Sequence, residues 1–187
     1  MLANTLFYEE VEELLSVVDR LGELMEEARI PYQLIGGMAV FLHVRSVSEE
    51  NTRLTNDVDV AIRRADLDKL KQCAFNHGFE YRHAAGIDML IDPQTRKAKG
   101  AVHFVFAGEK VRPNDVAPIP EITQPDRFGQ ICVAPLGQLL QMKLTSNRLK
   151  DMTHVRDMLN VSLITPEMEA ALPSALLERL EYIKAHE

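Results

Sequence analysis

The sequence predicts an α+β fold, in which a small mixed β-sheet has helices packed on one side and is followed by a C-terminal helical part. Three observations predict it. Apolar residues recur every three or four positions over residues 5–28, which is typical of an amphipathic helix. Short apolar or alternating runs follow one another between residues 32 and 133, as in a series of strands. Helical spacing then returns from Leu136 onwards.

We expect the 187 residues to form one compact unit in three parts. Residues 1–30 would be an N-terminal helix packed on the core, residues 31–134 an α/β core, and residues 135–187 a set of C-terminal helices. The core elements are predicted in two groups. Strands are expected at Tyr32–Ile35, Asp57–Ile62, Phe79–His83, Ile87–Ile91, Ala101–Ala107 and Gln130–Val133, and helices at Met38–Val44 and at residues 66–77.

Two further segments complete this outline. Four prolines favour an extended crossing segment over residues 112–127, which we expect to leave the sheet. In the C-terminal part, one helix begins at Leu136 and a second covers Asp151–Val161, and Pro166 and Pro173 mark two more helix starts.

Composition and charge narrow the class of protein. No run of about 18 apolar residues occurs, so we expect no membrane partner. The N-terminus lacks a signal-peptide pattern, and Cys73 and Cys132 lie far apart, which predicts reduced, buried thiols in a cytoplasmic protein. The net charge is −7, but the first 30 residues and the last 27 are acidic, which leaves +2 for residues 31–160. A charge of +2 in residues 31–160 is compatible with binding of a polyanion, but it is too small to indicate nucleic acid binding by itself.

A glycine pair marks the first candidate site. Gly36 and Gly37 follow a short apolar run and precede a helical pattern, which predicts a strand, a tight turn and a helix start. Because glycine has no Cβ, a ligand can approach the backbone closely there. The N–H groups at a helix start favour an anion such as phosphate. The simpler alternative is an ordinary turn.

Two aspartates mark the second candidate site. Asp57 and Asp59 lie two apart in a strand pattern, so their carboxylates share a face, while Val58, Val60 and Ile62 face the core. Two carboxylates this close repel each other unless a cation lies between them. Mg²⁺ typically takes one or two carboxylates and completes its shell with substrate phosphates. The alternative is a pair of solvated carboxylates on an exposed strand.

Taken in this order, the strand, the glycine pair, the helix and the strand with Asp-x-Asp resemble the signature of the DNA polymerase beta-like nucleotidyltransferase superfamily. Residues 36–40, His43 and the run from Thr52 to Asp59 resemble its minimal, abortive-infection-toxin (AbiEii-like) branch. The polar piece at residues 46–51 departs from that pattern as a loop extension. The resemblance covers roughly residues 31–160. It implies metal binding by Asp57 and Asp59, and nucleotide binding by Gly36, Gly37, Arg53 and Thr55.

The third acidic position of the superfamily is not an acid in this chain. It falls on His103, in an alternating strand with Val102, Phe104 and Phe106 on the opposite face. Mg²⁺ prefers oxygen ligands, so an imidazole suits Mn²⁺ or Zn²⁺ better, and its pKa also allows a role as general base. His103 could equally be an ordinary half-exposed side chain. Asp88, which the alternation places away from the core, is the rival third carboxylate.

A basic segment follows the sheet. By resemblance, Lys143 would reach the triphosphate, and Lys150 and Asp151 would close the site. If residues 141–157 are helical throughout, Lys143, Asn147, Lys150 and His154 line one face. Cations at that place would stabilise charge on a transferring phosphate. The alternative is an amphipathic surface helix with solvated charges.

We therefore expect a metal-dependent nucleotidyltransferase that uses Mg²⁺ or Mn²⁺. It would move a nucleoside monophosphate from a nucleoside triphosphate to a hydroxyl of a tRNA, a protein or a small molecule. The branch resemblance also implies a toxin opposed by an antitoxin partner. Two alternatives stay open: a catalytically degenerate nucleotide-binding or regulatory module with the same fold, and a glycosyltransferase, whose Asp-x-Asp also holds a metal-bound diphosphate.

Overall fold

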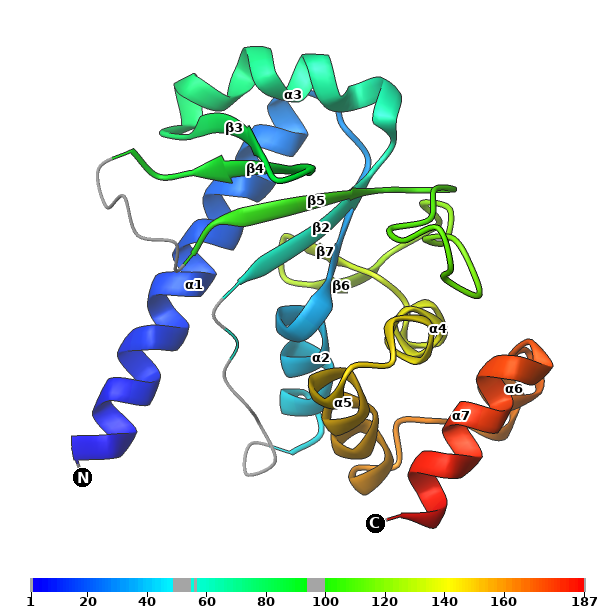
Figure 1. Cartoon of the computed structure of the whole chain (residues 1–187). Coiled ribbons are helices and arrows are strands. Elements are labelled where there is room, and N and C mark those ends of the chain that lie inside the picture. The colour runs from blue at the N-terminus through cyan, green and yellow to red at the C-terminus, as the bar shows by residue number, and fades with distance from the viewer. Residues whose placement is uncertain (1, 49–54, 56, 94–99, 187) are drawn as a thin grey trace.

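The computed structural model describes residues 2–48, 55, 57–93 and 100–186. Within these residues the chain forms seven α-helices and one seven-stranded mixed sheet, which confirms the predicted α+β class (Figure 1). The helices are α1 (Leu2–Glu27), α2 (Gly36–Arg45), α3 (Leu67–Ala74), α4 (Leu136–Ser146), α5 (Leu149–Asn160), α6 (Pro166–Ala170) and α7 (Ser174–Ala185). The strands are β1 (Tyr32–Ile35), β2 (Val58–Ile62), β3 (Glu80–Ala84), β4 (Ile87–Ile91), β5 (Val102–Phe106), β6 (Asp126–Phe128) and β7 (Ile131–Val133).

Strand β2 lies at the centre of the sheet, whose order is β3-β4-β5-β2-β1-β7-β6. It pairs with β1 in the antiparallel sense and with β5 in the parallel sense. The register sets Asp59 beside Ile35 on one side and beside His103 on the other. The carboxylate of Asp59 therefore lies where β1 turns into α2.

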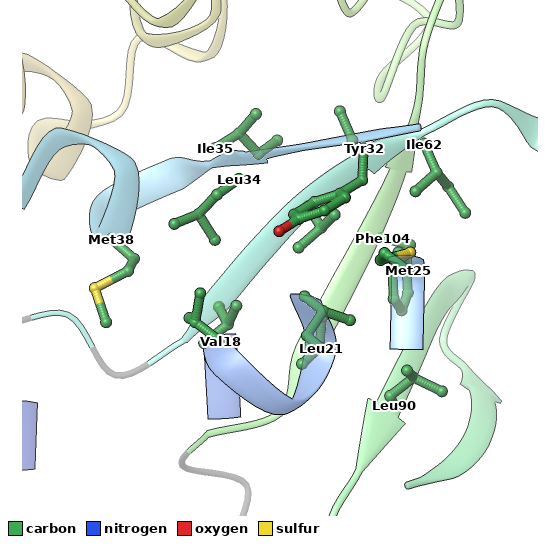
Figure 2. Close-up of a cluster of buried hydrophobic side chains, with 14 of the residues drawn as sticks. Val18, Leu21, Met25, Tyr32, Leu34, Ile35, Met38, Ile62, Leu90 and Phe104 are labelled. Atoms are coloured by element: carbon green, nitrogen blue, oxygen red, sulfur yellow. The ribbon is translucent and has the colours of Figure 1, made fainter. Parts of the chain in front are cut away.

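One face of the sheet is covered by α1 and α3. The alternation in β2 puts Val58, Val60 and Ile62 on this face, where they are fully buried. The apolar stripe of α1 packs against them because its large side chains recur at helical spacing. Figure 2 shows Val18, Leu21 and Met25 of this helix beside side chains of the sheet. Burying this surface is the main source of stability for the sheet.

The opposite face of the sheet carries the polar side chains Gln33, Asp59 and His103. Gln33 is buried and donates a hydrogen bond to the carbonyl of Thr123, 3.2 Å away. The extended segment that follows β5 therefore lies over this face, as the prolines predict. Its last part was predicted wrongly, because Asp126 and Arg127 rejoin the sheet in β6, which pairs with β7.

The C-terminal helices build a second core that is separate from the first. It contains residues of α2, α4, α5 and α7, and in Figure 1 the last two helices, α6 and α7, lie outside α4 and α5. Its buried members are Val40, Val44, Leu140, Leu144, Val155, Met158, Leu176, Leu180 and Ile183. Helix α2 contributes to both cores, so it connects the sheet to the helical part.

The two predicted C-terminal helices are present, and α5 begins at Leu149, two residues earlier than expected. The condition that residues 141–157 are helical throughout is not met, because Asn147 adopts the left-handed conformation (φ 50°) and separates α4 from α5. Helix α2 begins at Gly36, two residues earlier than expected. Both cysteines are free but only half-buried. Among the described residues, no helix combines the length and the apolar character that a membrane span requires.

Candidate active site

The turn between β1 and α2 brings the backbone against the first carboxylate. Gly36 has φ +71°, a conformation that favours glycine, and a Cβ at this position would overlap the carboxylate of Asp59. At Gly37 a Cβ would lie 2.7 Å from Oγ1 of Thr55 and 3.4 Å from Cε1 of His154. The glycine pair is therefore required here by the close approach of three side chains.

Helix α2 begins at this turn without a capping side chain. Its N-cap residue is Ile35, which has no side-chain group that could accept a hydrogen bond. The first N–H groups of a helix have no partner inside the helix, and they carry the positive end of its dipole. An anion placed beside Gly37 would accept hydrogen bonds from them.

Asp57, Asp59 and His103 gather on the face of the sheet that lies opposite α1. Nδ1 of His103 is 3.7 Å from Oδ1 of Asp59, and both side chains are partly exposed. The contact with Asp59 raises the pKa of His103 above its usual value, and the charge of Asp57 adds to this effect, whereas partial burial and the charge of Lys150 oppose it. The imidazolium form is thus stabilised by the two carboxylates.

The donor set fits a divalent cation that shares its shell with substrate. Asp57 and Asp59 offer hard carboxylate oxygens near His103, as Mg²⁺ and Mn²⁺ prefer, and the adjacent start of α2 has no capping side chain to compete with phosphate oxygens for its N–H groups. Within the described part of the chain, no group of three or more His, Cys, Asp and Glu side chains is arranged to hold a metal ion. A metal at this site would therefore take its remaining ligands from water and substrate.

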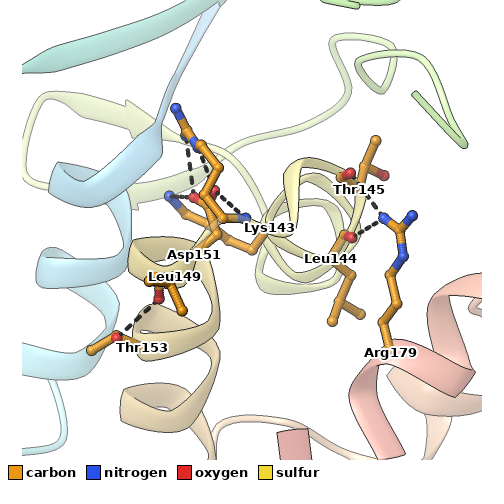
Figure 3. Close-up of polar contacts among 8 residues, drawn as sticks. Lys143, Leu144, Thr145, Leu149, Asp151, Thr153 and Arg179 are labelled. Carbon is orange, nitrogen blue, oxygen red and sulfur yellow. Dashed lines mark hydrogen bonds and ion pairs between the residues drawn. The ribbon is translucent and has the colours of Figure 1, made fainter. Parts of the chain in front are cut away.

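A buried ion pair lies beside these carboxylates. Nζ of Lys143 on α4 is 3.2 Å from Oδ1 of Asp151 on α5, and both side chains are almost fully buried (Figure 3). Arg148 donates to Oδ2 of the same carboxylate through its Nε at 2.7 Å. Burial raises the pKa of Asp151, but the hydrogen bond from Arg148 and the charge of Lys143 outweigh it and bring this pKa to about 2. Burial also lowers the pKa of Lys143, although Asp151 and Asp59 oppose that shift.

The structure brings most of the predicted site residues together. Gly36, Gly37, Thr55 and Asp59 meet at the turn. Asp59 acts electrostatically on Lys143, and Lys150 acts on His103, so these groups lie near one another. Asp151 lies in the same cluster, but its carboxylate is engaged by Lys143 and Arg148 and does not face a ligand. Arg53 lies outside the described residues.

Asp88 was predicted wrongly as a rival third carboxylate. It pairs in register with Phe104, whereas Met89 pairs with His103, so Asp88 lies on the core face of the sheet and not on the face of Asp59. There it is buried and accepts hydrogen bonds from the hydroxyl of Tyr81 and from Nδ1 of His83, at 2.5 and 2.9 Å. These bonds satisfy a carboxylate that would otherwise be costly to bury.

Two residues of the cluster were not predicted as site residues. Arg148 is the N-cap of α5, and its backbone N–H and its Nε both donate to Oδ2 of Asp151, three positions later. An Arg and an Asp three positions apart at a helix start are a local signal that could have revealed the pair. His154 was placed on the basic face but given no role, and its contact with Gly37 depends on the packing of α5 against α2, for which the sequence carries no local signal.

Known proteins resemble this chain in their structure and not in their sequence. No protein-family model matches the sequence, and no curated protein matches it. Among solved structures, the chain is similar to an antigenic nucleotidyltransferase-like protein from Paracoccidioides brasiliensis, with a TM-score of 0.63 and 20% identity over 94% of this chain and 89% of that one. The chain has the nucleotidyltransferase fold.

Two further structures share the nucleotidyltransferase fold. The Megavirus polyadenylate synthase matches with a TM-score of 0.57 and 10% identity, over 88% of this chain and 36% of that one. ANT(2")-Ia in complex with adenylyl-2"-tobramycin matches with a TM-score of 0.54 and 12% identity, over 93% of this chain and 98% of that one. At these identities the likeness concerns the fold.

Proposed function

We propose that this chain is a metal-dependent nucleotidyltransferase, which moves a nucleoside monophosphate from a nucleoside triphosphate to an acceptor hydroxyl. The observation that carries the proposal is the contact between Asp59 and the Gly36 turn, because it brings a cation-binding carboxylate to the anion-binding start of α2. Two of the structures with this fold support it by their named activities or contents, namely a polyadenylate synthase and an enzyme solved with an adenylylated aminoglycoside.

In the proposed reaction, three groups of residues would have different roles. The N–H groups at the start of α2, together with Arg148 and Lys150, would hold the triphosphate by hydrogen bonds and opposite charge. Asp57 and Asp59 would hold Mg²⁺ or Mn²⁺. When bound, the ion would supply charge neutralisation and orientation of the reacting oxygens. The buried Lys143–Asp151 pair would fix the positions of α4 and α5 beside the sheet.

The transfer itself requires one proton acceptor. A bond forms between the acceptor oxygen and the α-phosphorus, and the bond from that phosphorus to the bridging oxygen of pyrophosphate breaks. His103 is the titratable base beside Asp59, and in its neutral form it would take the proton of the acceptor hydroxyl. The cations of the α4–α5 connection would stabilise the departing pyrophosphate.

The test is a binding measurement. Isothermal titration calorimetry with Mn²⁺ and a nonhydrolysable ATP analogue should show binding to the wild type and at least a roughly tenfold loss in an Asp57→Asn/Asp59→Asn double variant. Asp68→Asn is the control, because Asp68 is an exposed aspartate on α3. Equal affinity in the wild type and the double variant would contradict the proposed site.

The identity of the acceptor is a separate prediction. A tRNA end, a protein side chain and a small molecule each present a hydroxyl that could approach the partly exposed Asp59 and His103. Incubation with radiolabelled nucleoside triphosphates and each acceptor class would identify it by transfer of label. The resemblance to the AbiEii-like toxin branch predicts that expression inhibits growth and that an antitoxin partner relieves the inhibition. A growth assay on induction tests this role.

A second candidate function is a catalytically degenerate nucleotide-binding or regulatory module. It is favoured by the imidazole at position 103, where the resemblance leads us to expect a carboxylate. Replacement of His103 by aspartate separates the two functions. A wild type that transfers no label, combined with a His103→Asp variant that does, would establish the degenerate module. No observation favours the glycosyltransferase alternative.

A further inference from the structure

His154 presents an unsatisfied polar group to the start of α2. Its Nδ1 is enclosed by protein and has no hydrogen-bond partner among the described residues. Buried polar atoms in folded proteins nearly always have a partner, so an exception at a candidate active site requires an explanation. The missing partner points to a ligand.

The orientation of the ring shows where such a ligand would lie. The atom of His154 that approaches Gly37 is Cε1, the carbon between the two ring nitrogens, at 3.4 Å from the position of a Cβ on Gly37. The edge that carries both nitrogens is therefore turned towards the first turn of α2. Thr55 approaches Gly37 as well, with its Oγ1 2.7 Å from the same Cβ position.

The charge state of His154 is set by its surroundings. Burial lowers the pKa of His154 to about 4, and the charges of Lys143, Lys150 and Arg148 act in the same direction, with Asp151 opposing them. The ring is therefore neutral near pH 7, and a neutral imidazole carries one N–H donor whichever tautomer is present. A donor beside three cations favours an acceptor that is itself anionic.

We propose that His154 is a substrate-contacting residue, which donates a hydrogen bond to an oxygen of the β- or γ-phosphate of the bound nucleoside triphosphate. This assignment rests on the proposed function. It names the terminal phosphates because Gly36 contacts Asp59, where the α-phosphate must react, whereas Gly37 contacts Thr55 and His154, one residue further along the helix start. The triphosphate would thus extend from Asp59 towards His154.

The experiment compares a triphosphate with the matching monophosphate. Calorimetric titration with Mn²⁺ and either a nonhydrolysable ATP analogue or AMP would be performed on the wild type, His154→Ala and His154→Gln. A hydrogen bond to a charged group predicts about tenfold weaker binding of the triphosphate to His154→Ala. Binding of AMP should change less than about twofold, and His154→Gln, which keeps a neutral N–H donor, should recover most of the affinity. Thr153→Ala is the control on the same helix.

A measurement on the unaltered protein complements the variants. The imidazole resonances of His154 should shift on addition of the triphosphate analogue and stay in place with AMP. Unchanged triphosphate affinity in His154→Ala, or an equal loss for triphosphate and monophosphate, would overturn the assignment while leaving the proposed function intact. A wild type that binds no triphosphate would overturn both.

Discussion

Asp151 is a buried carboxylate whose two oxygens both face cations. It contacts Lys143 on α4 and Arg148 at the start of α5, so it joins the two helices on either side of Asn147. Removing one member of a buried ion pair leaves the other charge uncompensated, which is a larger cost than the pair's own net contribution. Asp151 is therefore a positioning residue, which keeps Lys143 charged and in place.

The first prediction concerns this pair. Asp151→Asn should lower the free energy of unfolding by about 3 kcal/mol, because the ammonium group of Lys143 remains buried without a counter-charge. Urea unfolding followed by circular dichroism measures it. The double variant Lys143→Met/Asp151→Leu is the matched comparison, and it should recover most of the stability because neither charge is then left buried alone. A loss below about 1 kcal/mol in Asp151→Asn would contradict this account.

The second prediction is a pH dependence of stability caused by His154. The pKa of this group is about 4 in the folded protein, whereas in the unfolded chain it is near the ordinary value of 6.5. Between these two pH values the unfolded chain binds a proton that the folded protein does not, so stability falls as the pH drops from 6.5 to 4.

Thermal unfolding across this range would test the effect of His154. The melting temperature of the wild type should fall more steeply with acid than that of His154→Gln. Asp151 acts in a different window, because its pKa is lowered: its contribution is complete above its ordinary pKa of 3.8 and is lost as the pH falls towards 2. Parallel curves for wild type and His154→Gln between pH 6.5 and 4 would refute the buried, neutral state of His154.

At the scale of elements, the β1–α2 turn is the most constrained connection of the site. Gly36 combines a left-handed backbone with direct contact to Asp59, whereas Gly86, in the β3–β4 hairpin, has a similar φ of +77° and open space around its missing Cβ. An alanine at Gly86 would therefore cause backbone strain alone, whereas an alanine at Gly36 would cause the same strain and would also push away the Asp59 carboxylate.

The third prediction uses this pair of glycines. Gly86→Ala should cost about 1 kcal/mol of stability through strain alone and leave nucleotide binding unchanged. Gly36→Ala should lose a similar amount of stability through strain, and it should also displace the carboxylate of Asp59. The affinities for Mn²⁺ and for the triphosphate should therefore fall by at least roughly tenfold, or about 1.4 kcal/mol. Calorimetry on both variants measures this. Similar affinities in the two variants would show that Asp59 does not depend on the turn.

At the scale of the whole molecule, two cores support the site from two directions. The first lies between the sheet and α1, and the second lies among α2, α4, α5 and α7. Leu21 belongs to the first core and Leu180 to the second, and both are fully buried. Lys143, Asp151 and His154 all lie on helices of the second core, whereas Asp59 lies on the sheet.

The fourth prediction follows from this division. Leu21→Ala and Leu180→Ala should each lower the free energy of unfolding by about 3 kcal/mol, as expected for a buried leucine. Only Leu180→Ala should also weaken triphosphate binding, because it loosens the packing of α4 and α5. Denaturant unfolding and calorimetry on the two variants separate these effects. Equal nucleotide affinity in both variants would contradict a role of the second core in the site.

Local patterns predicted the parts of the site that depend on one strand or one turn. The alternation around Asp59 and His103 predicted the face on which each lies, and the glycine pair predicted the tight turn. In β4 the same rule failed. There Ile87 is exposed and Asp88 is buried, since register with β5 and hydrogen bonds from neighbouring side chains decide which face is covered.

The remaining features depend on contacts between distant segments. The sequence predicted two helices on either side of Asn147, but helical periodicity does not reveal the left-handed conformation of Asn147 that sets the direction of α5 relative to α4. The approach of His154 to Gly37 joins residues more than a hundred positions apart. Strand β6 is only three residues long. It forms because its backbone can pair with the edge of β7, whereas its own sequence does not favour a strand.

The guanidinium of Arg179 on α7 donates to the carbonyls of Leu144 and Thr145 at the end of α4, at 2.7 and 3.0 Å (Figure 3). A shortened version of the protein that stopped before α7 would retain every acidic residue of the candidate site. It would nevertheless expose the apolar side of α5 and free the last turn of α4. A shortened fragment that contains the sheet alone should therefore fail to keep the candidate site in place, and a tag fused at that end is best joined through a flexible spacer that leaves α7 undisturbed.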